Sequence, residues 1–421
     1  MHWALRAGVV AATALPWLML WSARRHTRPR LEGLHRDAPE EDLLGSLAGV
    51  GLGSSISGNS VQVLENGAFF DVLVDRIRAA RRTVHLETYL WKKGELNDRV
   101  VEALCDRARA GVKVRILADA WGAKRIAPEV PRQLRKAGCR LVWFHPFGFY
   151  TLGVFGDRDH RKLTVIDGQE AFVGGHCITD NWLGDAQDHD HFADVSVWLR
   201  GPIVHSVQSC FGENWGSATG EILIGDDVYP RLDAVGEVGM HAAFVKPTGW
   251  APAVKAVHHA AICMARERIW IQNPYFLPKP EAIVALGRAV SRGVDVRVLT
   301  PSPGASDNPV VQHASHRNFE NLLRRGVRIF EYPRTLLHQK LMTVDGRWCA
   351  VGSSNFDDRS FDTNDELVIG IQDRETTARI DGIFMKYAQE AREVDPREWA
   401  TRRKPLQKAR DHVYYLLNEV L

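Results

Sequence analysis

Two short stretches of the chain share one pattern: residues 160–167 read HRKLTVID and residues 338–345 read HQKLMTVD. Both fit H-x-K-x-x-x-x-D, for which roughly 0.04 chance matches are expected in a chain of this composition. Each stretch is followed by an apolar run that ends in glycine, at Gly174-Gly175 and at Gly352. The two stretches therefore correspond to one another as parts of a repeat.

The residue types within each stretch suit a site for a phosphodiester. The apolar residues that follow each lysine have strand character, and alternate residues of a strand share a face. His160 and Lys162 therefore point the same way, as do His338 and Lys340. Two halves that face one another would supply two imidazoles for attack and proton transfer, and two cations to hold the anion. Structural histidines in the core would explain one such motif, but not two in register.

The repeat extends beyond the motifs and predicts an α/β fold. Three further pairs of segments correspond: 82–91 with 268–277, 111–117 with 293–299, and 134–144 with 323–332. In each half the order is strand, helix, strand, helix, strand and then the motif, which is typical of helices flanking a mixed β-sheet. We expect two similar halves, residues 61–235 and 236–395, related by a pseudo-twofold axis with the site between them.

The remaining segments differ in composition from the two halves. Residues 1–30 include the apolar run 7–23 (AGVVAATALPWLMLWSA), which as a helix would span roughly 26 Å against a hydrocarbon core of about 30 Å. We expect an N-terminal apolar helix that is a retained membrane anchor, with a signal peptide or an interfacial helix as alternatives. Most arginines of this segment follow the run, which favours a cytoplasmic body. Residues 31–60 are expected to be a linker and residues 396–421 a C-terminal helix.

The composition excludes several classes of protein. Hydrophobic residues make up 45% and charged residues 25% of the chain, which excludes collagen, a mostly disordered chain and a polytopic membrane protein. The net charge is +3, and the arginines of residues 1–30 account for all of it, so no nucleic-acid partner is expected. The six cysteines form no C-x-x-C pair, which favours buried thiols in a reducing compartment over disulfides or zinc.

With both motifs in place, the chain resembles the phospholipase D superfamily over about residues 60–390, and it is most similar to bacterial cardiolipin synthases. The residues that carry the resemblance are the two motifs, Asn273-Pro-Tyr275-Phe, Gly352-Ser-Ser-Asn355-Phe-Asp-Asp-Arg359-Ser, Asn364-Asp-Glu366, Gly174-Gly175, Trp182 and Asp194. The resemblance implies a pseudo-twofold phospholipase D fold and a two-step transfer through a phosphohistidine, with no metal and no cofactor.

The resemblance also implies a role for each residue of the site. His160 would be the nucleophile, and His338 would protonate the leaving group and then activate the incoming alcohol. Asp194 would orient His160, and Glu366 would orient His338. The residues that would contact the substrate are Lys162, Lys340, Asn355, Ser353, Tyr89 and Tyr275.

Two aspartates of the motifs and one cysteine have different expected consequences for the site. Asp167 and Asp345 end the motifs, and we expect them to support the fold of the motif rather than to touch substrate. Cys177 stands where the family often has asparagine, and a thiol is a poor substitute for an amide. The first half would then hold phosphate less well, or would use His176 instead.

Two further segments carry weaker signals. Residues 143–155 (WFHPFGFYTLGVF) are an aromatic insertion before the first motif, which would line an acyl-chain groove, dip into a membrane interface or pack on the core. Residues 188–191 (DHDH) are expected to be a polar loop near the mouth of the site rather than a metal site.

The leading hypothesis is a cardiolipin synthase-type phosphatidyltransferase that joins a phosphatidyl group to phosphatidylglycerol. A hydrolytic phospholipase D that releases phosphatidic acid is the nearest alternative, followed by a nuclease of the superfamily and a non-enzymatic membrane scaffold. The expected partners are a phospholipid substrate and a membrane, and the expected location is the bacterial inner membrane with the catalytic body facing the cytoplasm. Oligomeric state does not follow from the sequence.

Overall fold

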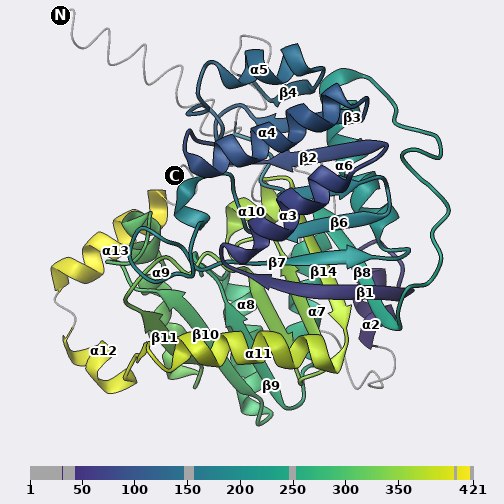
Figure 1. Cartoon of the computed structure of the whole chain (residues 1–421). Coiled ribbons are helices and arrows are strands. Elements are labelled where there is room, and N and C mark those ends of the chain that lie inside the picture. Colours follow the sequence, from purple (N-terminus) through teal and green to yellow (C-terminus); the bar gives the residue numbers. More distant parts are fainter. Residues whose placement is uncertain (1–30, 32–42, 147–155, 246–252, 403–404, 418–421) are drawn as a thin grey trace, which may run out of the picture. The chain divides into compact units, whose positions relative to one another are not determined.

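The computed structural model describes residues 31, 43–146, 156–245, 253–402 and 405–417, and all its helices and strands belong to one unit, Gly33–Leu421 (Figure 1). The expected apolar helix over residues 7–23 and most of the aromatic insertion lie outside the described residues. Among the helices that are described, none combines the length and the apolar composition needed to cross a bilayer.

The strands form one mixed sheet in the order β15-β11-β10-β9-β12-β13-β14-β8-β1-β7-β6-β5-β2-β3-β4. Those of the first half are β1 (Ile56–Glu65), β2 (Thr83–Thr88), β3 (Lys113–Asp119), β4 (Arg140–Phe144), β5 (Leu163–Ile166), β6 (Glu170–Gly174) and β7 (Val195–Arg200). Those of the second half are β8 (Val238–Val245), β9 (Arg268–Gln272), β10 (Asp295–Pro301), β11 (Arg328–Tyr332), β12 (Leu341–Val344), β13 (Trp348–Gly352), β14 (Glu366–Gln372) and β15 (Arg392–Glu393).

The helices connect and cover these strands. In the first half they are α2 (Leu43–Val50), α3 (Ala68–Ala79), α4 (Glu95–Arg109), α5 (Val130–Ala137), the short 3-10 helix Asp180–Trp182 and α6 (Val204–Thr219). In the second half they are α7 (Ala253–Met264), α8 (Pro280–Ser291), α9 (Pro309–Arg324), α10 (Asp358–Asp362), α11 (Arg374–Ala388), α12 (Pro396–Arg402) and α13 (Pro405–Leu417).

Counted outward from the central β1–β8 pair, the strands follow equivalent orders in the two directions: β1-β7-β6-β5-β2-β3-β4 in the first half and β8-β14-β13-β12-β9-β10-β11 in the second. This symmetry confirms two similar α/β halves. β2, β3 and β4 are parallel neighbours, as are β9, β10 and β11, and antiparallel strands join each trio to the centre. Strands β6 and β7 of the first half also lie against β13 and β14 of the second. The two half-sheets therefore pack face to face, joined along β1 and β8.

Three buried clusters hold the layers together. One fills the space between the half-sheets and draws on both of them, on α6 and on α11. The second lies under α7, α8 and α9, and the third lies under α3, α4 and α5. Burial of apolar area is the main favourable term in folding, so the shared central cluster is what docks one half on the other.

The chain before the first half departs from the expected linker. Within residues 31–60 the structure has α2 and the start of β1, and Leu47 of α2 is fully buried in the cluster under α7. The polar sequence at the start of β1 is not typical of a strand, and side-chain hydrogen bonds of Asn59 hold the strand in place. Asn59 Nδ2 donates to the carbonyl of Ile56 at 2.8 Å, and Asn59 Oδ1 accepts from the N–H of Ile203 at 2.8 Å. Glycine and serine composition alone therefore misleads here.

The C-terminal segment contains two helices rather than one. Helix α12 ends at Arg402 and α13 begins at Pro405. Proline is well tolerated in the first turn of a helix, which suits Pro405 as the first residue of α13.

Candidate active site

The two motifs lie at matching places in the fold, each leading into a short central strand. β5 pairs with β2 and β6, and β12 pairs with β9 and β13. The motif histidines and lysines precede these strands and are almost fully buried: His160 is 9%, Lys162 5%, His338 8% and Lys340 5% exposed. The structure thus brings the two imidazoles and two ammonium groups into one buried centre between the halves.

The aspartates that end the motifs lie at the far ends of these strands, away from the centre. Asp167 has φ +55° and Asp345 has φ +53°, the left-handed region that most residues avoid. The Asp345 carboxylate accepts the backbone N–H groups of Arg266, Glu267 and Arg268 at 2.8–2.9 Å, and Asp167 accepts three consecutive N–H groups in the same way. Asp167 and Asp345 therefore fix the turns that start the neighbouring strands β2 and β9.

The carboxylates that hold the imidazoles come from the opposite half, which corrects the expected pairing. His160 Nδ1 lies 2.9 Å from Glu366 Oε1, and His338 Nδ1 lies 2.7 Å from Asp194 Oδ2. Since an ionised carboxylate can only accept, each Nδ1 donates and each Nε2 is left for chemistry. The assignment by sequence distance, Asp194 to His160 and Glu366 to His338, is wrong.

Backbone contacts between the halves explain the exchange. The N–H of His160 donates to the carbonyl of Asp365 at 3.0 Å, and the N–H of His338 donates to the carbonyl of Ala193 at 2.8 Å. Each histidine segment is thus bridged to the residue just before the other half's acid. Proximity along the chain cannot show this, because the pairing exists only once the halves have docked.

Burial governs the protonation of the four central groups. It lowers the pKa values of His160 and His338 well below the usual 6.5, and Lys162 and Lys340 lower them further. Burial also raises the pKa of Glu366 to about 7 and that of Asp194 above its usual value. Burial therefore disfavours the charged form of both the imidazoles and the carboxyl groups in this centre.

The lysines are positioned by their own motifs and carry the positive charge of the centre. Lys162 Nζ donates to the carbonyl of His160 and Lys340 Nζ to the carbonyl of His338, both at 2.5 Å. Burial lowers the pKa of Lys340 to about 8, although Asp194 opposes this shift. An ammonium group has three donors, so two remain on each lysine for phosphoryl oxygens.

An aromatic ring stands edge-on to each catalytic imidazole. The ring of Tyr89 lies 5.0 Å from that of His160 between centroids, and Lys162 Nζ lies 5.2 Å from the Tyr89 centroid. On the other side, the Trp182 ring lies 5.0 Å from that of His338, and Trp182 Nε1 donates to Asp194 Oδ2 at 2.7 Å. Trp182 therefore fixes both the acid and the histidine, a role that its place in the sequence does not reveal.

Of three residues expected to contact the substrate, Ser353 and Tyr275 already use their hydroxyl groups in hydrogen bonds within the described part of the protein, and Asn355 does not use its side-chain oxygen in this way. Asn355 Oδ1 is buried and has no hydrogen-bond partner among the described residues. The hydroxyl of Ser353 donates to Glu366 and accepts from the N–H of Leu367 at 3.1 Å, so it positions the acid. The hydroxyl of Tyr275 donates to Asp307. Of these three, Asn355 is best placed to bind a phosphoryl oxygen.

In the described part of the first half, neither Cys177 nor His176 supplies a phosphate ligand to match Asn355. Cys177 is buried, and its Sγ contacts the carbonyl of Gly175 at 3.7 Å. Both ring nitrogens of His176 are engaged, with Ser196 Oγ at 2.7 Å and the carbonyl of Asn66 at 3.0 Å. His176 therefore packs in the first half and does not replace the missing amide.

Arg359 is a further cation of the site. Its place in the sequence marks it as part of a family motif but does not predict a role for it. Arg359 lies on α10, four residues after Asn355, and is partly buried. Burial and the two lysines lower the pKa of His160 most, and the positive charge of Arg359 lowers it further; the same charge opposes the rise that burial causes in the pKa of Tyr89. No carboxylate of the described residues forms an ion pair with Arg359. The corresponding residue in the first half is Asn181, whose Nδ2 donates to the carbonyl of Asp190 at 2.9 Å. The cation is thus specific to the His160 side of the centre.

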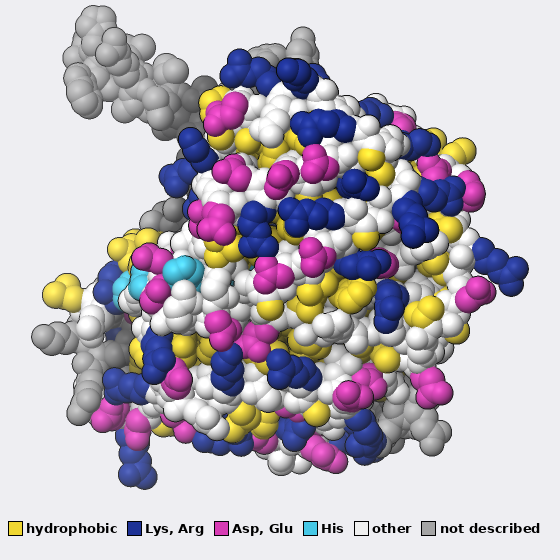
Figure 2. Space-filling model, in the orientation of Figure 1, with side chains coloured by type: hydrophobic (Ala, Val, Ile, Leu, Met, Phe, Trp, Pro, Cys, Tyr) yellow, Lys and Arg dark blue, Asp and Glu magenta, His cyan; other side chains and the backbone are white. Residues whose placement is uncertain are grey.

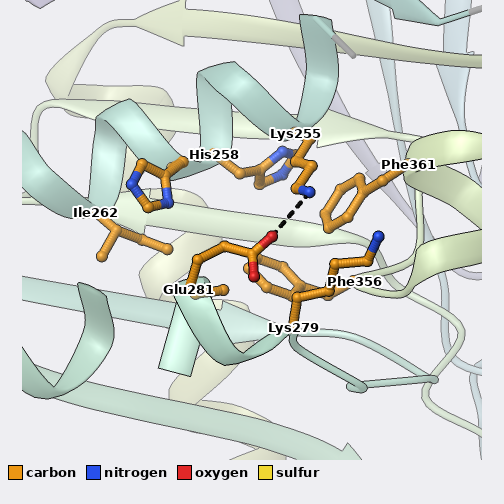
Figure 3. Close-up of a pocket in the computed structure, with 9 residues that line it drawn as sticks. Lys255, His258, Ile262, Lys279, Glu281, Phe356 and Phe361 are labelled. Atoms are coloured by element: carbon orange, nitrogen blue, oxygen red, sulfur yellow. Dashed lines mark ion pairs between the residues drawn. The ribbon is translucent and has the colours of Figure 1, made fainter. Parts of the chain in front are cut away.

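Two other polar regions lie outside the catalytic centre. Residues 188–191 form an exposed loop in which His191 Nδ1 lies 2.7 Å from Asp188 Oδ1, and nowhere in the described residues do three or more potential ligands gather as a metal site would require. Figure 3 shows a pocket between α7, the start of α8 and α10, in which Lys255 and Glu281 pair at 2.9 Å beside Phe356 and Phe361. This pocket contains neither motif histidine.

Comparison with known proteins agrees with this arrangement. The family model described as "Cardiolipin synthase, PLD-like domain" matches residues 73–215 and 259–388. A cardiolipin synthase of Geobacillus sp. (strain WCH70) is 32% identical over 88% of this chain and 72% of its own length. Cardiolipin synthase 2 of Bacillus anthracis is 33% identical over 79% of this chain and 65% of its own length, so the chain spans about two thirds of these relatives.

Solved structures show the same fold at low sequence identity. The phosphatidylserine synthase of Haemophilus influenzae Rd KW20 superposes with a TM-score of 0.67 at 14% identity, covering 86% of this chain and 95% of that one. The polyphosphate kinase of Porphyromonas gingivalis gives a TM-score of 0.54 at 15% identity over 93% of this chain and 58% of its own. At these identities the likeness concerns the fold alone.

Proposed function

Because the chain belongs to the cardiolipin synthase family of phospholipase D-like proteins, we propose that it is a phosphatidyltransferase that joins the phosphatidyl group of one phospholipid to the hydroxyl of phosphatidylglycerol. The observation that carries this proposal is the pair of buried imidazoles, each hydrogen-bonded at Nδ1 by a carboxylate from the opposite half. Two such histidines suit a reaction that needs one nucleophile and one proton carrier.

In the first step, His160 Nε2 attacks the phosphorus of the donor. A P–N bond forms, the P–O bond to the headgroup breaks, and His338 gives its proton to the departing alkoxide. Glu366 stabilises the positive charge that develops on the phosphorylated imidazole. Lys162, Lys340 and Asn355 hold the non-bridging oxygens, whose charge they offset in a centre from which water is largely excluded.

In the second step, the hydroxyl of phosphatidylglycerol gives its proton to His338 and attacks the same phosphorus. The new P–O bond forms as the P–N bond breaks, and His160 leaves as a neutral imidazole. Asp194 supports His338 as it alternates between its neutral and protonated states. Both steps use only side chains of this protein, so we expect no metal and no cofactor.

Substrate choice and location follow from the same proposal. The bacterial relatives bear the name cardiolipin synthase, which supports phosphatidylglycerol as the acceptor. Arg359 beside His160 would offer a further positive charge to the phospholipid. The apolar run of residues 7–23, followed by arginines, supports attachment to the inner membrane with the catalytic body in the cytoplasm.

Product analysis tests the proposal. The purified full chain is incubated with phosphatidylglycerol vesicles in the presence of EDTA, and lipids and released alcohol are identified by mass spectrometry. We expect cardiolipin and glycerol in equal amounts, and none from His160→Ala or His338→Ala. Phosphatidic acid without cardiolipin would make the protein a hydrolase, and cleavage of DNA in place of lipid would make it a nuclease.

A further inference from the structure

We propose that helix α13 and the loop that bears Trp121 form a surface that docks on the phospholipid bilayer, one on each side of the active site. The inference rests on the proposed function, because it assumes that the substrate resides in a membrane. The proposal identifies the part of the fold that contacts this membrane, and neither the motifs nor the names of the relatives indicate that part.

Helix α13 has one docked face and one exposed apolar face. On its docked face Asp411 is 1% exposed, and Arg410 lies 3.0 Å from the imidazole of His313 on α9. On the other face Leu406 is 83% and Val413 is 52% exposed. These two residues are seven apart and therefore lie on the same side of the helix. Figure 2 shows hydrophobic side chains at the left margin, where Figure 1 places α13.

Helix α13 is fixed next to the catalytic centre. Tyr414 and Tyr415 pack with Tyr275 against a small cluster around Val311 of α9. Arg317 of the same helix lies 3.9 Å from the ring of Tyr415. Tyr275 follows β9 at the edge of the sheet where the motif histidines lie, so α13 is packed at the same edge as the catalytic centre.

The Trp121 loop lies in the first half, where it follows β3 at the edge of the sheet that bears the motif histidines. Trp121 is 48% exposed, and Lys124 Nζ lies 3.5 Å from the centroid of its ring. Asp119, at the end of β3, accepts the N–H of Trp121 at 2.9 Å and, through its other oxygen, the N–H of Asp159 at 3.0 Å. Asp159 precedes His160, so Asp119 links the backbone of the exposed tryptophan to the catalytic segment.

The chemistry of both anchors suits an anionic lipid surface. Tryptophan favours the boundary between apolar and aqueous regions, and lysine can bury its methylene chain while its ammonium group meets phosphate. In the Trp121 loop both residue types are present, because Lys124 Nζ lies over the Trp121 ring. On α13, Leu406 and Val413 supply the exposed apolar side chains that would enter the headgroup region.

Other exposed apolar residues lie elsewhere and provide a matched control. Ile222 is 82% and Ile224 is 76% exposed. Their segment is tied to the amino ends of the parallel strands, where Asp227 pairs with Lys113 at 2.6 Å. That edge of the sheet is opposite the catalytic centre, so exposure alone does not define the proposed surface.

The kinetic test uses the full chain and two forms of phosphatidylglycerol, vesicles and a short-chain monomeric lipid. We expect Leu406→Asp/Val413→Asp to lower kcat/KM on vesicles at least tenfold and to leave the rate on the short-chain lipid within twofold. We expect Ile222→Asp/Ile224→Asp to match the wild type on both. An equal loss on both lipids, or no loss on vesicles, would overturn the proposal.

A second measurement separates this proposal from the proposed activity. Spin labels are placed at Val413→Cys and at Ile222→Cys in a Cys263→Ser background, because the other five cysteines are buried. With phosphatidylglycerol vesicles, we expect the label at 413 to gain access to oxygen and to lose access to a polar nickel reagent, and the label at 222 to remain in water. Labels that behave alike, or that report contact between two copies of the chain, would refute membrane docking even in an inactive protein.

Discussion

The exchange of acids between the halves predicts which reaction step each acid serves. We consider Glu366→Gln and Asp194→Asn, which keep the shape of the side chain and remove its charge. Glu366 contacts His160 at 2.9 Å and Asp194 contacts His338 at 2.7 Å. The first substitution should therefore impair the nucleophile and the second should impair the proton carrier.

The size of the effect follows from the loss of one charge-assisted hydrogen bond. Such bonds contribute about 1.5 to 3 kcal/mol, against about 1 kcal/mol for a neutral bond. The difference of about 0.5 to 2 kcal/mol, applied to the positive charge that develops on His160, slows formation of the phosphohistidine by roughly 2- to 30-fold. The loss is larger if the amide that replaces the Glu366 carboxylate turns its NH2 group toward the ring.

The assay uses a phosphatidyl ester of p-nitrophenol, whose leaving group departs without a proton. Stopped-flow absorbance then reports the first step as a burst of nitrophenolate. We expect Glu366→Gln to slow the burst by this factor, and Asp194→Asn to leave it within about twofold while slowing later turnover. On phosphatidylglycerol, which needs protonation of its leaving group, both variants should be slow. A burst slowed more by Asp194→Asn than by Glu366→Gln would refute the assignment.

Three further changes probe the site and its support. As pH rises through about 8, kcat/KM should fall because Lys340 loses its charge, and Lys340→Arg should abolish this fall; an unchanged pH profile in the variant would contradict the role of Lys340. Arg359→Gln should raise KM for phosphatidylglycerol about fivefold to tenfold with kcat nearly unchanged, and a selective loss of kcat would argue against substrate binding. Asp345→Ala removes the acceptor of three backbone N–H groups, two of them open to solvent, and should lower the free energy of unfolding by about 1 to 2 kcal/mol in urea denaturation, with Asp345→Asn in between; equal stability would count against a structural role.

The sequence predicted the fold well because duplication leaves two copies of every signal. The alternation of strands and helices, the motifs and the following glycines all recur, and each copy supports the interpretation of the other. The start of β1 was missed because its Gly and Ser residues are typical of a linker, whereas Asn59 holds the strand in place through side-chain bonds to distant backbone.

Contacts between the two halves could not be predicted from the sequence of either half. The identities of Asp194 and Glu366 could be predicted, but their partners could not, because each acid is positioned by a backbone contact made only after docking. Trp182 and Ser353 differ in this respect, because each lies in the same half as the acid that it orients, 12 and 13 residues before it. Only the pairing of each acid with its histidine depends on contacts between the halves.

Location of the covalent intermediate tests the central claim most directly. The wild-type enzyme is mixed with phosphatidylglycerol, quenched within the first turnover under conditions that preserve phosphohistidine, digested, and analysed by mass spectrometry. The account predicts a phosphatidyl group on the peptide that contains His160 and none on the peptide that contains His338. A phosphatidyl group on His338 would reverse the two roles, and turnover without any adduct on either histidine would contradict the two-step transfer.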